Sequence, residues 1–438
     1  MLKRKIEELL ILWKNEKGKK AFLVKGARQV GKTTSIRAFG KSQYKTFIEL
    51  NFERNPDLCN IFSGSLDART IQLNMSAMGY GPFVPGETLI FFDEIQACPK
   101  ARTAIKFLVE DGKYDFIESG SLLGINYNDV SSYPVGFETQ HEMHSLDFEE
   151  FLWAKGVGEE VIHELRKCVS EKKELSNAIH QTMMRHFREF MIVGGMPSVV
   201  SKFVQSNDLT IVIQEQKDII NSYRDDVKKY AGSNKTKVSE IFDSIPAQLN
   251  KKNKRFYLSA LKKEPKMRTY EEAILWLFDA KIASPCYNIA AIELPLALNE
   301  KRNLFKVYMN DTGLLTALSY LGIQSEILNG NIEINEGSII ENALADAFLK
   351  NGFLLHYYDR KKPTSMEIDF VIQVRDTVQV IESKSGSDFE KHDSLNTLLK
   401  EKNIGEPIVF CTENIHETNG ILYLPYYLGF ALRNDDLR

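Results

Sequence analysis

The chain has 438 residues, of which 43% are hydrophobic and 26% are charged, and its formal net charge is −3. This length exceeds one ordinary hydrophobic core and predicts roughly three domains. The near-neutral charge excludes a global basic field, so any contact with nucleic acid must come from a local patch. Five scattered cysteines without a CxxC pair favour free thiols in a reducing compartment over disulfides or a zinc site.

The first 20 residues predict an amphipathic helix rather than a targeting segment. Its apolar face would carry Ile6, Leu9, Leu10 and Trp13. The charged start Met-Leu-Lys-Arg-Lys lacks the apolar stretch of a signal peptide. No apolar run reaches the roughly 18 residues that a spanning helix needs. We therefore expect a cytoplasmic protein without a membrane partner.

Short apolar runs alternate with helical segments up to about residue 145. The runs predict strands over residues 21–24, 47–50, 88–92 and 114–117, and helices are expected between them, including residues 35–39 and 101–109. Buried strands that alternate with helices indicate a parallel sheet.

A glycine-rich segment follows the first of these strands and fits the pattern G-x-x-x-x-G-K-[ST] at the start of a helix. Its glycines would let backbone N–H groups surround phosphate oxygens, and the helix N-terminus adds partial positive charge. Lys32 is expected to reach the β- and γ-phosphates of ATP, and Thr33 to bind Mg²⁺. The alternative, a loop that binds nothing, is disfavoured by the strand–loop–helix context. The predicted ATP-binding residues are Gly26, Ala27, Arg28, Gln29, Val30, Gly31, Lys32, Thr33 and Thr34.

Polar residues end the third and fourth predicted strands, where a parallel sheet brings them close to the phosphate loop. Asp93 is expected to hold the Mg²⁺ shell and Glu94 to polarise the attacking water. The alternative is that Asp93 and Glu94 have only a structural role at the end of the strand. Ser119 and Ser121 are candidates for contact with the γ-phosphate or the water, and a simple glycine-serine turn is the alternative. Gln96 is either a phosphate sensor or a surface glutamine.

The middle of the chain is predicted to be helical over residues 146–230, with a turn at 194–197. Two or three short helices and a strand should follow over residues 236–290, including a helix over 270–282, and another strand over 305–309. The segment 251–268 is strongly basic, with two aromatic residues among its cations, and is a candidate contact for DNA phosphates. A solvated loop and helix face is the alternative. Its cations are Lys251, Lys252, Lys254, Arg255, Lys262, Lys263, Lys266 and Arg268.

The last segment combines a predicted helix over residues 338–349 with strands over 354–358, 368–374, 378–381 and 407–410. Glu341 lies on the helix and Asp369 on the second strand, while Glu382 and Lys384 are two residues apart on the third. Three carboxylates in this order would gather Mg²⁺, and Lys384 would orient water or stabilise developing phosphate charge. This is the layout of PD-(D/E)xK nucleases. The alternatives are the same fold without activity, and a coincidental set of surface charges in which Glu341 caps a helix or forms an ion pair.

Several motifs occur in a family-like order: GARQVGKT, LIFFDEIQ, ESGSLL, SLDFEEFL and GGMP. With residues 305–314 and 337–342, they resemble uncharacterised prokaryotic P-loop ATPases of the AAA+ superfamily that carry a C-terminal domain of unknown function. The resemblance covers nearly the whole chain. It implies an α/β chain with an AAA+-like core over 1–145, a helical region over 146–235, a winged-helix-like module over 236–330 and a restriction-endonuclease-like domain over 331–438.

One departure from the family concerns the arginine that would act as an arginine finger or γ-phosphate sensor. The family usually has Gly-Arg before the LDFEEFL segment, whereas this chain has Gly136 followed by Phe137. Arg102 and Arg224 are the substitutes considered.

We expect an ATPase that uses Mg²⁺ and couples hydrolysis to nucleic acid, with a homo-oligomer expected by analogy. The alternative is an ATP-dependent switch or scaffold whose nuclease-like domain is an inactive interaction surface.

Overall fold

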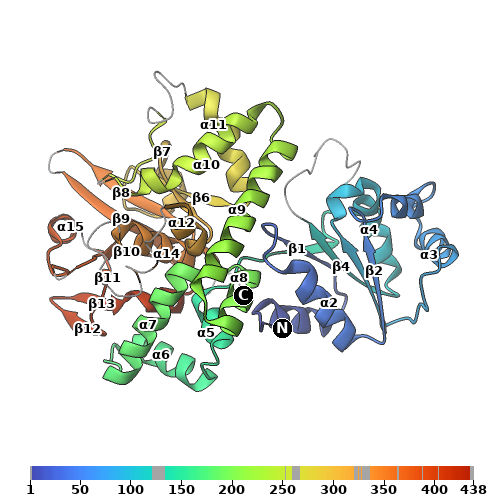
Figure 1. Ribbon diagram of the computed structural model, residues 1–438, viewed down its shortest axis with the longest axis horizontal. Coiled ribbons are helices and arrows are strands. Elements are labelled where there is room, and N and C mark those ends of the chain that lie inside the picture. Colours follow the sequence, from blue (N-terminus) through green and yellow to red (C-terminus); the bar gives the residue numbers. More distant parts are fainter. Residues whose placement is uncertain are drawn as a thin grey trace. The chain divides into compact units, whose positions relative to one another are not determined.

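The computed structural model describes residues 2–120, 134–251, 253–258, 267–319, 336–362, 365–386, 388–402 and 404–434, together with Gln324 and Ile327. The chain divides into two compact units. The first contains Lys3–Ser145 with Asp279–Lys281, and the second contains Leu146–Phe278 with Ile282–Arg438. Figure 1 labels many of the helices and strands of both units.

A five-stranded parallel sheet forms the first unit, in the order β2-β3-β4-β1-β5. Four strands were predicted, and the structure confirms them. The fifth, β5, was missed because its sequence ETQHE is polar, and its pairing with β1 alone makes it a strand. The strands are β1 (Ala21–Lys25), β2 (Thr46–Asn51), β3 (Thr88–Asp93), β4 (Asp115–Gly120) and β5 (Glu138–Glu142).

Both faces of this sheet are buried, as an α/β architecture requires. Phe22 and Val24 point to a core shared with α1 and α2, while Leu23 points to a core shared with α3, α4 and the 3₁₀ helix η1. Leu9 was predicted on the buried face of α1, but it is 43% exposed because the face is narrower. The helices are α1 (Ile6–Lys14), α2 (Lys32–Gln43), α3 (Ala68–Ala77) and α4 (Pro99–Asp111), with η1 (Pro56–Phe62) and η2 (Ile95–Ala97).

The second unit begins with helices, as predicted. Met196 and Pro197 follow a turn at Gly194, which separates α7 from α8 as expected. The helix predicted over 270–282 runs earlier, from Met267 to Asp279. These helices are α5 (Phe148–Ala154), α6 (Glu159–Glu171), α7 (Asn177–Val193), α8 (Pro197–Ser206), α9 (Leu209–Tyr230), α10 (Lys235–Leu249) and α11 (Met267–Asp279), with the 3₁₀ helix η3 (Gly232–Asn234).

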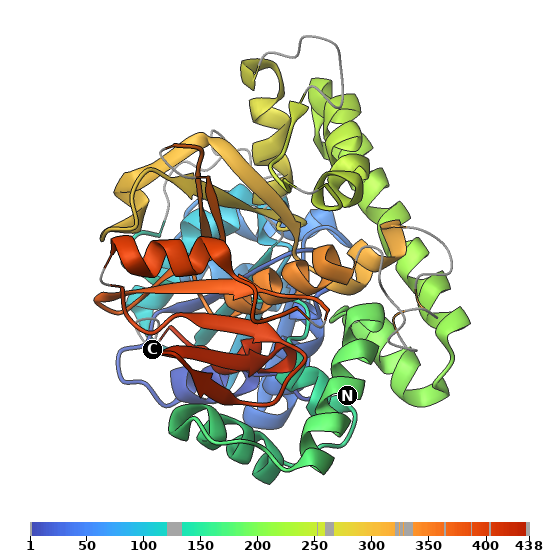
Figure 2. The same cartoon turned by 90° about the vertical axis from the view of Figure 1, so that its left-hand side faces the viewer.

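An eight-stranded mixed sheet completes the second unit, in the order β12-β13-β11-β10-β9-β8-β6-β7. Figure 2 shows its C-terminal strands in orange and red, with α15 running along them. The short hairpin β12–β13 was not predicted. The strands are β6 (Ala283–Ile289), β7 (Glu300–Met309), β8 (His356–Arg360), β9 (Met366–Val374), β10 (Thr377–Ser383), β11 (Ile408–Cys411), β12 (His416–Thr418) and β13 (Ile421–Pro425). The remaining helices are α12 (Thr312–Ser319), α14 (Glu336–Lys350) and α15 (Asp393–Glu401), with the 3₁₀ helices η5 (Leu296–Asn299) and η6 (Tyr426–Ala431).

This sheet crosses the position where a winged-helix-like module and a nuclease-like domain were predicted to meet. β6 and β7 precede residue 330, yet β6 pairs in parallel with β8. Strands from both predicted domains therefore share one sheet, and the boundaries at 235 and 330 remain predictions.

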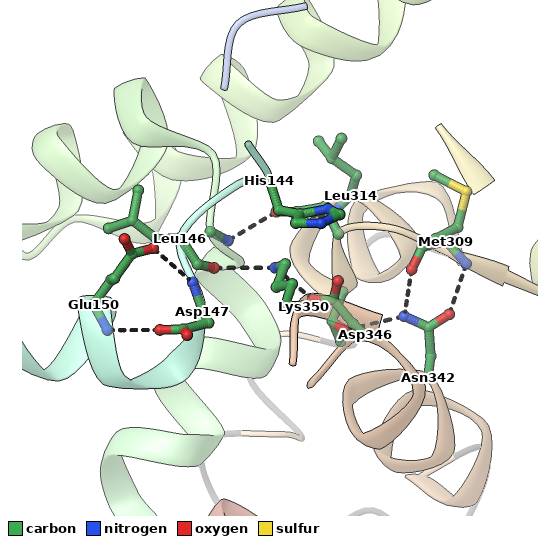
Figure 3. A network of polar contacts seen from close by, with 12 residues as sticks. His144, Leu146, Asp147, Glu150, Met309, Leu314, Asn342, Asp346 and Lys350 are labelled. Carbon is green, nitrogen blue, oxygen red and sulfur yellow. Dashed lines mark hydrogen bonds and ion pairs between the residues drawn. The ribbon is translucent and has the colours of Figure 1, made fainter. Parts of the chain in front are cut away.

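The motifs after residue 145 meet in a polar network within the second unit (Figure 3). Asp147 and Glu150 form a reciprocal cap at the start of α5, with Glu150 N–H donating to Asp147 Oδ1 at 2.8 Å. Lys350 Nζ donates to the Leu146 carbonyl at 3.1 Å and pairs with Asp346 at 2.7 Å. The LDFEEFL segment thus anchors α5 to α14.

Gly195 connects this network to Asp311, the residue before α12. Leu146 N–H donates to the Gly195 carbonyl at 2.7 Å, and Gly195 N–H donates to Asp311 Oδ2 at 2.8 Å. A Cβ atom on Gly195 would lie 1.9 Å from the Leu146 carbonyl oxygen. The GGMP motif, and Asp311 in the family-like segment 305–314, therefore have a structural role at this close approach.

Substituting Gly195 by alanine should lower the free energy of unfolding by about 1–3 kcal/mol, because the added methyl group forces two backbone segments apart. Urea denaturation measures the change. Gly405→Ala is the matched control, since a Cβ there meets nothing within 4 Å. Equal unfolding midpoints for the two variants would contradict the close approach.

Candidate functional site

The glycine-rich loop joins β1 to α2 in a backbone conformation that glycine permits. Gly26 has φ +154° and Gly31 φ +96°, and Gln29 also lies in the left-handed region at +65°. A Cβ on Gly26 would lie 2.1 Å from the Met143 carbonyl oxygen. This loop therefore runs tightly into the N-terminus of α2, which is the arrangement that binds phosphate.

The other predicted loop residues divide into buried and outer positions. Ala27 and Val30 are buried in the core beside α1. Arg28 forms an ion pair with Glu53 at 3.2 Å. Thr34 is exposed on the first turn of α2. Ala27 and Val30 thus pack the loop against the core beside α1.

Lys32 lies inside the loop. Its Nζ donates to the carbonyl oxygens of Gly26 at 3.0 Å and Ala27 at 2.7 Å. Burial lowers the pKa of Lys32 to about 8, which the carboxylates of Glu94 and Asp93 only partly offset. The two groups that accept hydrogen bonds from the Lys32 ammonium are neutral carbonyl oxygens. A buried ammonium with neutral partners is suited to bind an anionic phosphate.

Asp93 is the centre of the polar site at the end of β3, where it is 2% exposed. Thr33 Oγ1 donates to it at 3.0 Å, Ser119 Oγ at 2.5 Å and Asn51 Nδ2 at 2.7 Å. The structure thus brings together the predicted Thr33, Asp93 and Ser119. Asn51 was missed, although its place at the end of β2, in register with Asp93, could have identified it.

Glu94 follows in a left-handed conformation, with φ +54° and ψ +50°. Gln96 Nε2 donates to Glu94 Oε2 at 2.6 Å. A Cβ on Gly120 would lie 2.6 Å from Gln96 Oε1, so the glycine leaves room for this side chain. The hydrogen bond from Gln96 thus restrains the Glu94 carboxylate. Ser121 lies outside the described residues.

The two arginines considered as substitutes are engaged elsewhere. Arg102 is buried between Glu118 and Glu138, with ion pairs of 2.6 and 2.8 Å. Burial raises the pKa of Glu118 to about 7 despite the nearby Arg102. Arg224 pairs with Asp243 on α10 at 2.8 Å. None of these three ion pairs involves a P-loop residue.

The C-terminal carboxylates surround a lysine that sequence reasoning did not assign. Lys306 Nζ on β7 lies 3.1 Å from Glu341 Oε1, 3.3 Å from Glu367 Oε1 and 3.9 Å from Asp369 Oδ1, and its side chain is 0% exposed. Burial acts against the charge of Lys306, but Glu341 and the other carboxylates raise its pKa well above the usual value. An internal ammonium thus lies beside Glu341 and Asp369, two of the three acids predicted to bind metal.

Two further groups complete the surroundings of Glu341. Lys254 Nζ and the Tyr308 hydroxyl both donate to its carboxylate. Burial alone would raise the pKa of Glu341, but Lys254 and Lys306 outweigh it and lower the pKa to about 2. Glu341 is therefore a charged carboxylate whose oxygens are already bound.

Glu382 on β10 and Lys384, just after the end of that strand, form a separate pair, with Lys384 Nζ 2.6 Å from Glu382 Oε2. Asp369 accepts a hydrogen bond from Ser383 N–H at 2.9 Å. Burial and the Asp369 charge raise the pKa of Glu382 to about 7, although Lys384 opposes them. Within the described ranges, no group of three or more His, Cys, Asp or Glu side chains is arranged to hold a metal ion.

The basic segment is partly turned toward this cluster. Lys254 contacts Glu341, and Phe256 stacks on Phe305 with ring centroids 5.9 Å apart. Lys254 is therefore engaged inside the second unit rather than presented to DNA. Lys252, Lys262, Lys263 and Lys266 lie outside the described residues, as does the side chain of Arg268.

Comparison with protein families supports the class that the first unit defines. Residues 18–152 match the model of a family described as an AAA domain, so this part of the chain is similar to AAA domains. Residues 184–326 match a Domain of unknown function (DUF8612), and residues 336–427 match another (DUF4143). Neither description names a winged helix or a nuclease. Among curated proteins, no match was found.

Solved structures with some similarity include the Aeropyrum pernix Orc1 protein in complex with DNA, at 11% identity and a TM-score of 0.28, covering 72% of this chain and 90% of that one. The Thermotoga maritima RuvB Holliday junction branch migration motor matches at 12% identity and a TM-score of 0.30, covering 65% and 89%. TM-scores this low support no argument about function. In the described part of the chain, no helix is long and apolar enough to cross a membrane.

Proposed function

We propose that the chain binds ATP with Mg²⁺ at the loop of residues 26–34 and hydrolyses it. The observation that carries this proposal is the buried carboxylate of Asp93, which side chains from α2, β2 and β4 hold beside the P-loop. A hydroxyl and a carboxylate are ligands that suit Mg²⁺, which usually keeps several waters and phosphate oxygens in its shell. The bound ion would neutralise charge on the transferred phosphoryl group.

The chain's own residues then have separate roles. Lys32 would exchange its two carbonyl partners for phosphate oxygens, while Thr33 and Asp93 hold the metal. Glu94 would orient the attacking water as a base, positioned by Gln96. Ser119 would keep the Asp93 carboxylate in place.

Substituting Glu94 by glutamine should leave ATP binding intact and slow hydrolysis by about 100-fold or more, because the water loses its base. Fluorescent-nucleotide titration and steady-state turnover measure the two effects. Glu110→Gln, at an exposed position on α4, is the matched control. A Glu94→Gln variant that fails to bind nucleotide would contradict the assigned role.

For the C-terminal cluster, we propose the switch or scaffold rather than the nuclease. Lys306 lies between Glu341, Glu367 and Asp369, where a nuclease of the predicted layout would gather Mg²⁺. The expected result is that the purified chain does not nick plasmid DNA with Mg²⁺. Nicking that disappears in Lys384→Ala would instead establish the nuclease. The cytoplasmic location and the homo-oligomer remain proposals from the sequence.

A further inference from the structure

A polar cavity of about 720 Å³ lies beside edge strand β2 in the first unit. Residues of α2, of β2 and of the segments that follow β2 and α3 line it. They include Arg37, Lys41, Glu49, Asn51, Arg54 and Tyr80. None of these residues belongs to the predicted ATP-binding set.

The cavity is predominantly basic. Glu49 is the one acid among the described residues that line it, and it is bound by Arg37 through Nε at 2.7 Å and Nη2 at 2.5 Å. Lys41 lies one helical turn beyond Arg37, and Arg54 faces the cavity from the segment after β2. Both are exposed and, among the described residues, make no ion pair. Two cations are therefore available to an anionic ligand.

An aromatic ring and side-chain amides complete the lining. Tyr80 is half-buried at the cavity. Cations beside an aromatic ring are the combination by which proteins bind the backbone and stack the bases of single-stranded nucleic acid. Asn51 and Asn55 can donate to phosphate oxygens or accept from bases. The half-exposed Arg37 and the exposed Lys41, Arg54 and Asn55 favour an extended phosphodiester over a small enclosed phosphate.

Asn51 connects this cavity with the ATP site. Its Nδ2 donates to Asp93 Oδ2 at 2.7 Å, and its Oδ1 accepts from Arg54 N–H at 2.7 Å. A ligand that shifts the backbone of Arg54 would therefore also disturb a direct partner of Asp93. The cavity lining and the ATP site share this one side chain.

We propose that this cavity binds the phosphodiester backbone of single-stranded nucleic acid, and that occupancy alters ATP turnover through Asn51. The binding part stands without the ATPase activity, whereas the coupling part rests on the proposed function. Lys41 and Arg54 contact phosphates, and Tyr80 stacks on a base.

Binding is tested by fluorescence anisotropy with a labelled 20-nucleotide oligo-dT and the full chain, without ATP. Lys41→Glu/Arg54→Glu should weaken binding by about tenfold or more and lower the salt dependence, since two phosphate contacts are lost. Arg69→Glu/Lys113→Glu makes the same charge change at two exposed positions of the unit and should stay within about twofold of the wild type. Equal weakening in both variants, or no binding by the wild type, would overturn the proposal.

A competition experiment separates the source of the phosphate. Inorganic phosphate should displace the oligonucleotide no better than NaCl at equal ionic strength. Specific displacement by phosphate would overturn the nucleic-acid assignment in favour of a small phosphate.

The coupling is tested by the ratio of ATP turnover with and without the oligonucleotide. The ratio should depart from one in the wild type and stay at one in Lys41→Glu/Arg54→Glu. A ratio of one in an active wild type would overturn the coupling. If the wild type shows no turnover at all, the proposed function fails, while the anisotropy measurement still decides the cavity.

Discussion

Replacing Lys32 by alanine is expected to lower ATP turnover by about 100- to 1,000-fold, the usual effect of removing one preorganised electrostatic group from a reacting centre. Lys32 is the buried cation nearest the loop carbonyls, and its pKa of about 8 reflects a desolvated ammonium ready for an anion. Without it, charge that develops on the β- and γ-phosphate oxygens has only Mg²⁺ and the backbone N–H groups as partners. Steady-state turnover with saturating Mg²⁺ measures the loss.

A second lysine provides the control for this experiment. Lys45 is 69% exposed and pairs with Glu87 across the start of the sheet, so Lys45→Ala should turn over ATP like the wild type. Wild-type turnover by Lys32→Ala would refute the P-loop assignment. Retained oligonucleotide binding by Lys32→Ala would also show that the variant is folded.

That Thr33, Asp93 and Ser119 lie together at the proposed nucleotide site could be predicted, because these residues belong to local sequence patterns. The loop follows one strand directly, and Asp93 and Ser119 end two others, so parallel pairing alone brings them together. Asn51 was missed because a single asparagine at a strand end has no motif of its own. Strand β5 was missed because backbone pairing with β1, not apolar alternation, holds it.

The C-terminal cluster was predicted less well, for a different physical reason. The spacing of Asp369, Glu382 and Lys384 identified the acids. The cation beside these acids was expected to be a bound Mg²⁺, whereas the structure has the side chain of Lys306 beside Asp369. Lys306 lies 63 positions before Asp369, on a strand that joins the same sheet only through β6 and β8. Contacts between distant strands are set by tertiary pairing, which sequence spacing does not report.

Lys306→Met should lower the free energy of unfolding by about 3–5 kcal/mol, because it removes a central cation from the buried Glu341 and from two partly exposed acids. The side chain is 0% exposed, and the three carboxylates keep it charged. Urea denaturation measures the loss. Arg302→Met on the same strand is the control, since its side chain is 81% exposed and its ion pair with Glu300 should contribute little.

Charge balance distinguishes this account from a simple loss of packing. Adding Glu341→Gln to Lys306→Met should recover part of the lost stability, because the second change removes a buried carboxylate that has lost one of its two lysine partners. In the wild type, the pKa of Glu341 falls from 4.5 to about 2 on folding, so its contribution is complete above pH 4.5 and is lost as the pH falls toward 2. With Lys306 gone, the folded-state pKa of Glu341 should rise toward 4.5, so that acid-induced loss should be smaller and should end at a higher pH. An additive double variant with an unshifted acid transition would mean that Lys306 fills space without neutralising the acids.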